Sequence, residues 1–244
     1  MEYPHEPVLL HEVIQALITV PDGIYVDGTV GSGGHSEAIG RRISGEGRLI
    51  CLDTDAFGVR LSGERLSFLG ERVTVVRSSY SDLEFILKDQ GLTGVDGILL
   101  DLGLSSYQLD QSGRGFSFTR NEPLDMRMDT EKGMTAGQLL MDLTPEALKK
   151  ILKEFGEERK AGLIVKAIER ERRKGKIDSS LKLAGLIQGV IPPSRRPKHP
   201  ATRTFQALRI AVNNELGNLR SFLDSVPNLL KRGGQAGHLV LSLA

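Results

Sequence analysis

The chain has 244 residues and one cysteine, so a disulfide framework is excluded and the length allows one large domain or one domain with an insertion. Hydrophobic residues make up 39% and charged residues 26%, and the net charge is +1, so any affinity for nucleic acid must come from local patches. The five histidines show no metal-ligand spacing, so no metal is expected. No stretch reaches the roughly 20 apolar residues of a membrane span, and no signal peptide is apparent; we therefore expect a cytoplasmic protein.

The first predicted elements are an apolar helix within residues 5–19 and a short buried strand over residues 23–26. The stretch Asp27-Gly28-Thr29-Val30-Gly31-Ser32-Gly33-Gly34-His35 follows and leads into a helix that ends near Arg42. A strand that turns through glycines into a helix can hold a nucleotide-like ligand, because glycines let the backbone close on it. The third glycine of a dinucleotide loop would fall at Ser36, so the loop instead resembles the S-adenosylmethionine loop of Rossmann-like methyltransferases. A tight turn without a ligand is the structural alternative.

Two further strands are each followed by a candidate ligand contact. The strand over residues 48–53 ends at Asp53, about 20 residues after the loop, where the Rossmann plan places an acid that binds ribose hydroxyls. Asp55 is the rival candidate, and capping a turn is the alternative role. The strand over residues 73–76 is followed by Tyr80, which either contacts an adenine base or is an exposed loop residue.

The fourth strand, residues 95–101, completes a series of β-α repeats that favours a doubly wound, mainly parallel sheet. It continues into Asp101-Leu102-Gly103-Leu104-Ser105-Ser106 at the carboxyl edge, where open α/β sheets bind ligands. Amino-methyltransferases place a polar residue here that accepts a hydrogen bond from the amine. The amine of a cytosine or adenine is conjugated with the ring and is therefore a poor nucleophile. A carboxylate that accepts a hydrogen bond from its N–H favours the pyramidal form, in which the lone pair is exposed. Asp101 is therefore the candidate catalytic residue.

The β-α rhythm stops after the fourth strand. Residues 108–129 have no clean period and indicate an ordered loop, whereas residues 135–189 are helical by pattern. We expect residues 109–200 to form an inserted loop and helical RNA-binding domain. Residues 1–108 and 201–244 are expected to form the methyltransferase core.

Two basic stretches stand out in the expected insert. Residues 159–176 hold eight Lys or Arg against two Glu, and a solvated helix face explains them equally well. Residues 194–203 hold four Lys or Arg with no acid, and their prolines prevent a continuous helix. A basic loop of this kind is better explained by phosphate contact, so Arg195, Arg196 and Lys198 are candidate RNA contacts.

By these motifs the chain resembles the ribosomal small-subunit methyltransferase H family, also called MraW, whose members methylate N4 of a decoding-centre cytosine in 16S rRNA. The stretches that carry the resemblance are residues 5–10, 27–35, 101–106, 114–118, 123–129 and 201–210. The resemblance implies S-adenosylmethionine as the cofactor, with contacts at Gly33, Gly34, His35, Asp53, Tyr80, Asp101 and Gln108. It also implies a Rossmann-like fold with a helical insert that helps to grip RNA, and 16S rRNA of the small ribosomal subunit as the partner. Naked RNA and the assembled subunit both remain open as substrates, as does the oligomeric state.

Two other functions compete with this interpretation. An NAD-dependent oxidoreductase would share the strand-loop-helix pattern, but Ser36 in place of the third glycine counts against it. A catalytically impaired RNA-binding relic would share the insert, but an intact Asp101 and glycine loop count against that.

The C-terminus departs from the family pattern. Helices are expected over about 202–219 and 219–230, and a strand over 237–242. Relatives follow the Gly233-Gly234 pair with a strand resembling R-L-V-V-I-S-F-H-S-L-E-D, whereas this chain continues Q-A-G-H-L-V-L-S-L-A. Codons for this tail, read one base later, can encode R-L-V-I-L-S-F-H-S. We therefore expect a one-base frameshift before Gln235 and truncated C-terminal sheet strands, with a natural short variant as the alternative.

Overall fold

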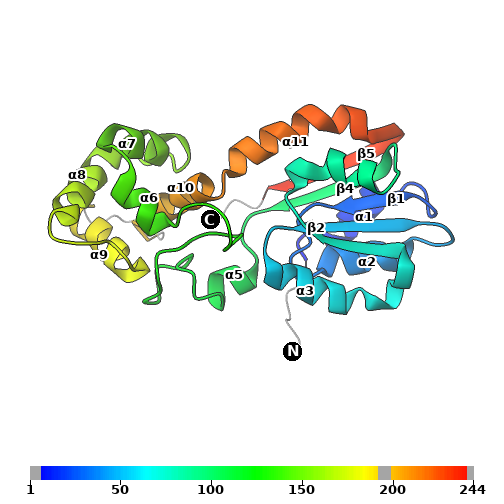
Figure 1. Cartoon of the computed structure of the whole chain (residues 1–244), viewed down its shortest axis with the longest axis horizontal. Helices are drawn as coiled ribbons and strands as arrows, with labels where there is room; N and C mark the ends of the chain where they lie inside the picture. The colour runs from blue at the N-terminus through cyan, green and yellow to red at the C-terminus, as the bar shows by residue number, and fades with distance from the viewer. Residues whose placement is uncertain (1–6, 192–198, 241–244) are drawn as a thin grey trace. The chain divides into compact units, whose positions relative to one another are not determined.

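The computed structural model describes residues 7–191 and 199–240 (Figure 1). These residues divide into two compact units: unit 1 comprises residues 7–105 and 216–240, and unit 2 comprises residues 106–191 and 199–215. Residues 201–215 are predicted from the sequence to belong to the methyltransferase core, whereas their contacts group them with unit 2. The functional domain limits at residues 108 and 200 stay a prediction.

Unit 1 is built around a parallel sheet in the strand order β3-β2-β1-β4-β5 within the described residues (Figure 1). The strands are β1 (Ile24–Asp27), β2 (Arg48–Asp53), β3 (Val73–Arg77), β4 (Val95–Leu102) and β5 (Leu230–Val240). Because β1 lies between β2 and β4, the chain winds outward from it in both directions. This confirms the predicted α/β fold with a doubly wound parallel sheet, and the carboxyl end of β1 is where such sheets bind ligands.

Helices cover both faces of this sheet because its strands alternate apolar side chains between two cores. Tyr25 and Leu49 belong to one core with residues of α1 and α2, whereas Val26 and Ile50 belong to the other with residues of α4 and α11. The helices of unit 1 are α1 (Leu10–Leu17), α2 (Gly34–Arg42), α3 (Ala56–Arg65), α4 (Leu83–Asp89) and α11 (Glu215–Leu229), with short 3₁₀ turns η1 (Ser67–Arg72) and η2 (Tyr80–Asp82). Because helices pack on both faces of the sheet, the positions of the strand ends that carry the candidate site are set by two cores.

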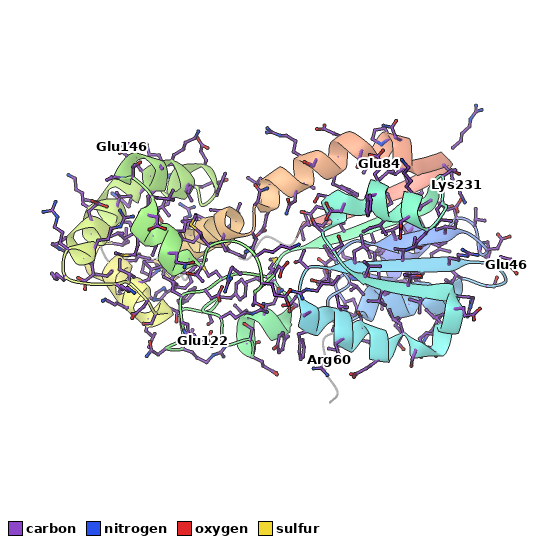
Figure 2. The ribbon with its side chains drawn as sticks, in the orientation of Figure 1. Glu46, Arg60, Glu84, Glu122, Glu146 and Lys231 are labelled. Carbon is purple, nitrogen blue, oxygen red and sulfur yellow. The ribbon has the colours of Figure 1, made fainter. Side chains whose placement is uncertain are left out.

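The last strand, β5, pairs in parallel with β4 and begins earlier than the sequence pattern indicates. Near its start, Lys231, labelled in Figure 2, forms a 2.6 Å ion pair with Asp96 of β4. Residues 235–237 of β5 are exposed, although they pair with the apolar stretch 97–99 of β4. Residues 241–244 lie outside the described residues, and the frameshift stays a prediction.

Within its described residues, unit 2 combines helices with a non-helical segment over residues 111–134, and the helices from residue 136 onward follow the predicted pattern. Its helices are α5 (Ser106–Asp110), α6 (Ala136–Asp142), α7 (Pro145–Glu154), α8 (Ala161–Arg172), α9 (Ser180–Val190) and α10 (Thr202–Val212). Thr135 begins α6 with a capping box, and Thr144 caps α7 ahead of Pro145, so hydroxyl side chains define these helix starts. The break between α10 and α11 falls at Asn213 and Asn214 rather than near residue 219.

The lone cysteine, Cys51, is a buried thiol of β2, as predicted. In the described part of the chain, no helix is long and apolar enough to cross a membrane. The same residues contain no group of three His, Cys, Asp or Glu side chains that could hold a metal ion.

Candidate functional site

The glycine loop leaves β1 at the carboxyl edge of the sheet. Gly28 and Val30 donate backbone hydrogen bonds of 2.9 Å to β4 and β2 respectively, so the loop is fixed to both neighbouring strands before it turns. Gly31 and Gly33 then take positive φ angles of 49° and 81°, which glycine adopts at little cost. Among the residues that the structure describes, no side chain caps the start of α2, so the backbone amides of its first turn are available to a polar ligand.

Asp53 supports this loop from the end of β2. Its Oδ2 accepts a 2.9 Å hydrogen bond from the Gly31 amide, and its Oδ1 accepts one of 2.8 Å from the Asp55 amide. Burial raises the pKa of Asp53 to about 6, and these two hydrogen bonds oppose the shift. Each carboxylate oxygen has a second lone pair, so ribose hydroxyls can still donate to Asp53. The rival, Asp55, is buried and caps α3 through a 3.1 Å bond from the Phe57 amide, which favours Asp53 as the ribose acid.

Asp27, the acid that opens the loop, is buried and serves the loop itself. Its Oδ2 accepts a 2.6 Å hydrogen bond from the Ser36 hydroxyl, and its Oδ1 accepts one of 3.1 Å from the Thr29 amide. Burial raises the pKa of Asp27 above its ordinary value, while these two bonds act in the opposite direction. The Ser36 hydroxyl therefore has a specific partner at the position where a dinucleotide loop has its third glycine.

Asp101 lies near the end of β4 and is joined to the glycine loop. Its backbone N–H donates a 2.6 Å hydrogen bond to Oγ1 of Thr29. Its Oδ2 lies 3.8 Å from Nδ1 of His35, whose ring is buried and whose Nε2 lies 3.1 Å from the Val8 carbonyl. The sheet edge thus brings together two of the predicted site residues, Asp101 and His35, and adds Thr29, which sequence reasoning did not single out.

Two further residues, Pro7 and Arg65, hold the loop through contacts that have no recognisable signal in the sequence. A Cβ atom on Gly34 would lie 2.6 Å from Cγ of Pro7, so the N-terminal segment packs directly on the start of α2. From α3, Arg65 donates to the Ser32 carbonyl at 3.2 Å and to the Glu37 carboxylate at 2.6 Å. These contacts limit the space in which the loop can move.

The aromatic candidate, Tyr80, lies in η2 and is half-buried. Its ring meets the ring of Phe222 edge-on, with centroids 5.6 Å apart, so part of it packs in the core of unit 1. Gln108 is buried in α5 and belongs to unit 2. Contacts of Tyr80 and Gln108 with a cofactor stay predictions.

In unit 2, buried polar side chains order the segment over residues 114–129. Arg114 is buried and donates to two main-chain oxygens farther along the segment, both at 3.0 Å. Asp125 and Arg127 form an ion pair with two hydrogen bonds, of 2.7 and 2.9 Å. Glu122, labelled in Figure 2, accepts a backbone N–H of the same segment at 2.9 Å. Residues 111–129 form the predicted loop, whereas residues 108–110 belong to α5, and these contacts explain how a stretch without periodicity is ordered.

Asn213, which directly follows α10, closes this segment from a distance in the chain. Its Nδ2 donates to the Met126 carbonyl at 2.8 Å, and its Oδ1 accepts from the Met128 amide at 2.7 Å. Met126 has a φ of 59°, a left-handed backbone conformation that is unfavourable for residues other than glycine. The two bonds from Asn213 hold the backbone on both sides of this residue.

Two groups of cations can be distinguished within the basic run over residues 159–176. Lys166, Arg170 and Arg173 are exposed at helical spacing along α8 and its C-cap, and they form no ion pair with the residues that the structure describes. Other cations of the run are paired: Arg172 with Glu169 at 2.6 Å, and Lys174 with Glu171 at 3.3 Å. The first group is therefore available to an anionic partner.

The three cations predicted to touch RNA, Arg195, Arg196 and Lys198, lie outside the described residues, and their role stays a prediction. The described end of that stretch is His199, whose ring stacks on Phe118 with centroids 4.5 Å apart. Phe118 in turn meets Phe205 of α10 edge-on at 5.4 Å. This aromatic group joins the end of the basic stretch to the loop that carries Phe118.

Comparison with known proteins gives a match over nearly the whole chain. A family model described as the MraW methylase family matches residues 2–242. The Ribosomal RNA small subunit methyltransferase H of Heliobacterium modesticaldum is 45% identical over 238 residues, which cover 96% of this chain and 76% of that protein. The protein of the same name from Geobacter sulfurreducens is 46% identical over 237 residues, with the same two shares. The chain thus spans about three quarters of the length of these relatives.

Solved structures are similar to smaller parts of the chain. A SAM-dependent methyltransferase from Aquifex aeolicus matches 38% of this chain and 48% of its own, with 16% identity and a TM-score of 0.31. An O-methyltransferase from Bacillus cereus in complex with SAH matches 40% and 47%, with 21% identity and a TM-score of 0.34. The family match does not depend on these partial similarities.

Proposed function

The chain belongs to the MraW methylase family, and we propose that it methylates the N4 amine of a decoding-centre cytosine in 16S rRNA. It is an S-adenosylmethionine-dependent rRNA methyltransferase. The observation that carries the finer proposal is the carboxylate of Asp101 at the end of β4, bonded through its backbone to Thr29 of the glycine loop. An amine substrate needs such an acceptor beside the methyl donor.

The residues of unit 1 fit the proposed cofactor by their chemistry. When bound, S-adenosylmethionine supplies an electrophilic methyl group on a positively charged sulfur. The half-buried carboxylate of Asp53 can accept hydrogen bonds from ribose hydroxyls, and the glycine loop offers backbone N–H groups without side chains in the way. The Asp101 carboxylate accepts a hydrogen bond from the N–H of the amine, and this interaction favours the geometry in which the nitrogen lone pair can attack the methyl group.

The oxidoreductase alternative is not favoured. A dinucleotide loop uses its third glycine to bring the helix close to the strand, whereas Ser36 uses its hydroxyl to bind the buried Asp27 at 2.6 Å. The family match over residues 2–242 and the names of the relatives also favour methyl transfer.

We further propose that unit 2 contacts rRNA phosphates within the small ribosomal subunit. The support is the row of exposed cations Lys166, Arg170 and Arg173, which form no ion pair with the described residues of the chain. Cations of this kind bind phosphate and release counterions, which makes affinity salt-dependent. Arg195, Arg196 and Lys198 are proposed to extend the same contact.

Transfer of a labelled methyl group tests the proposed function directly. Small ribosomal subunits that lack the modification and the naked 16S rRNA are each incubated with labelled S-adenosylmethionine and the full chain. We expect label in N4-methylated cytidine after digestion to nucleosides, and the two substrates show which form of the RNA is used. Label in another nucleoside would contradict the base assignment. Cofactor binding by calorimetry without any transfer would leave the family fold but contradict the activity.

A further inference from the structure

The orientation of the His35 ring is fixed by the N-terminal segment. Its Nε2 lies 3.1 Å from the carbonyl oxygen of Val8, and a carbonyl can only accept a hydrogen bond. Nε2 therefore carries a hydrogen, and in the neutral ring the lone pair is on Nδ1. Because Pro7 packs against Gly34 next to the histidine, the segment that supplies this carbonyl is itself held against the start of α2.

The other ring nitrogen faces the candidate catalytic carboxylate. Nδ1 of His35 lies 3.8 Å from Oδ2 of Asp101, and the His35 side chain is only 7% exposed. An unprotonated Nδ1 and an ionised carboxylate are both acceptors, so a proton that reaches Asp101 can be shared between the two groups. Catalytic hydrogen bonds are often long before the substrate binds, and a small rotation of Asp101 would bring the two atoms into hydrogen-bond range.

We propose that His35 is a positioning residue for Asp101 that orients its carboxylate toward the amine and takes up, through it, the proton that the amine loses. This inference rests on the proposed function. In the reaction, the nitrogen lone pair forms the new N–C bond while the C–S electron pair returns to sulfur, which becomes neutral. The methylated nitrogen then releases its proton to the Asp101 carboxylate, which passes it to Nδ1 of His35. The positive charge lost from sulfur thus appears on the imidazole and leaves later with the proton to solvent.

A second carboxylate near this pair, Asp27, does not compete with Asp101 for this role. Asp27 at the end of β1 is buried, burial raises its pKa, and its two oxygens accept hydrogen bonds from the Ser36 hydroxyl and the Thr29 amide. Asp101 is less buried and lies at the strand end where ligands bind.

The first experiment compares the wild-type protein with His35→Gln. Glutamine can still donate its side-chain N–H to the Val8 carbonyl but cannot take up a proton, so it preserves the packing and removes the proposed chemistry. We expect single-turnover methyl transfer to fall about tenfold or more at saturating cofactor, with the saturating concentration set by calorimetry on each protein because His35 is also a predicted cofactor contact. In the wild type the rate should fall on the acid side as the pair becomes protonated before the reaction. In His35→Gln this acid limb should move to lower pH. An unchanged rate with an unchanged acid limb would overturn the proposal.

The second experiment does not require activity, so it can fail independently of the proposed function. In ¹⁵N spectra with S-adenosylhomocysteine bound, the two ring nitrogens of His35 give separate signals, which His35→Gln assigns by their loss. Asp101→Asn should move the Nδ1 signal and leave the Nε2 signal in place, because only Nδ1 faces residue 101. An Nδ1 signal that does not respond to Asp101→Asn would show that the pair is not coupled and would overturn the proposal, even if methyl transfer were found.

Discussion

The sheet edge of unit 1 and the 114–129 segment of unit 2 are both held by partly buried polar groups, but their partners are arranged differently along the chain. At the sheet edge, the contacts join residues that leave neighbouring parallel strands, such as Asp101 with Thr29 and Asp53 with Gly31. In unit 2, the segment is closed by Asn213, which is 87 residues from Met126 and lies outside any repeat.

This difference separates a site set by topology from a site set by individual side chains. Parallel strands bring their carboxyl ends to one edge whatever their sequences, so a functional residue there needs only the correct place in a strand. The 114–129 segment has no ladder of backbone bonds to define it, so each polar contact contributes directly to its conformation. The sheet edge should therefore respond to substitution through binding and rate, and the segment through local stability.

The largest effect is expected for Asp101→Asn, which tests whether the sheet edge acts on the reaction. An amide is a weaker acceptor than a carboxylate and cannot take up a proton, so one transition-state interaction is lost. We expect single-turnover methyl transfer to fall about 100- to 1,000-fold, as for loss of one preorganised hydrogen bond in other active sites. The thermal unfolding midpoint is the control and should change little, because the backbone bond from residue 101 to Thr29 remains. Near-normal turnover would remove Asp101 from the mechanism.

Asp53→Ala should have the next largest effect, on cofactor affinity. A hydrogen bond to a charged group contributes about 1.5–3 kcal/mol, so S-adenosylmethionine binding should weaken about ten- to hundredfold in calorimetry. Asp55→Ala is the matched control, because Asp55 caps α3 instead. That variant should lose about 0.5–2 kcal/mol of stability with little change in affinity. Equal losses of affinity in the two variants would contradict the assignment of ribose to Asp53.

The raised pKa of Asp53 predicts a pH dependence with a defined sign. Burial raises this pKa to about 6, so Asp53 becomes protonated as the pH falls through about 6. The protonated group accepts hydrogen bonds less well, and cofactor affinity should therefore weaken below this pH. The contribution of Asp53 to folding stability has the opposite trend: it is fully present below the unfolded pKa of about 3.9 and is lost as the pH rises through about 6. In Asp53→Asn the cofactor affinity should not change between pH 7 and pH 5, roughly one unit on either side of the pKa. If the affinity of this variant falls with pH as steeply as that of the wild type, another group causes the effect.

Asn213→Ala tests the other side of the comparison, the local stability of unit 2. It leaves the Met126 carbonyl and the Met128 amide without their partner, which costs about 1–3 kcal/mol for an unsatisfied buried group. Amide hydrogen exchange over residues 114–129 should become faster, with the amides of β1 and β2 as the internal reference. Asn213→Asp keeps the acceptor for the Met128 amide but places a carboxylate oxygen against the Met126 and Arg209 carbonyls, so it should speed exchange as well. Unchanged exchange in the alanine variant would show that the segment is held by its own ion pairs.

The same comparison explains which features the sequence could predict. The strands over residues 48–53 and 95–101 were predictable because buried parallel strands are short, apolar and separated by helices. Asp53 and Asp101 followed from their places at strand ends. The roles of Thr29 and Asn213 could not be predicted, because a hydroxyl or an amide has no periodicity that reveals a partner far along the chain. The break between α10 and α11 lies at residues 213–214, whereas the sequence predicts it near residue 219. Both flanking segments have helical patterns, so periodicity does not locate the break.

The smallest effect is expected for the exposed cations of unit 2. Replacing Lys166, Arg170 and Arg173 together by glutamine removes charge but keeps polar side chains of similar length. If each cation contacts a phosphate, the negative slope of log affinity against log salt for small-subunit binding should become shallower by about 0.7–0.9 per cation removed, while cofactor affinity is retained. Lys174→Gln is the matched control, because Lys174 is paired with Glu171 and should leave the slope nearly unchanged. Arg195, Arg196 and Lys198, replaced together, should lower the slope in the same way. A slope that is the same in all of these variants and the wild type would mean that these cations face only solvent and that RNA is held by another surface.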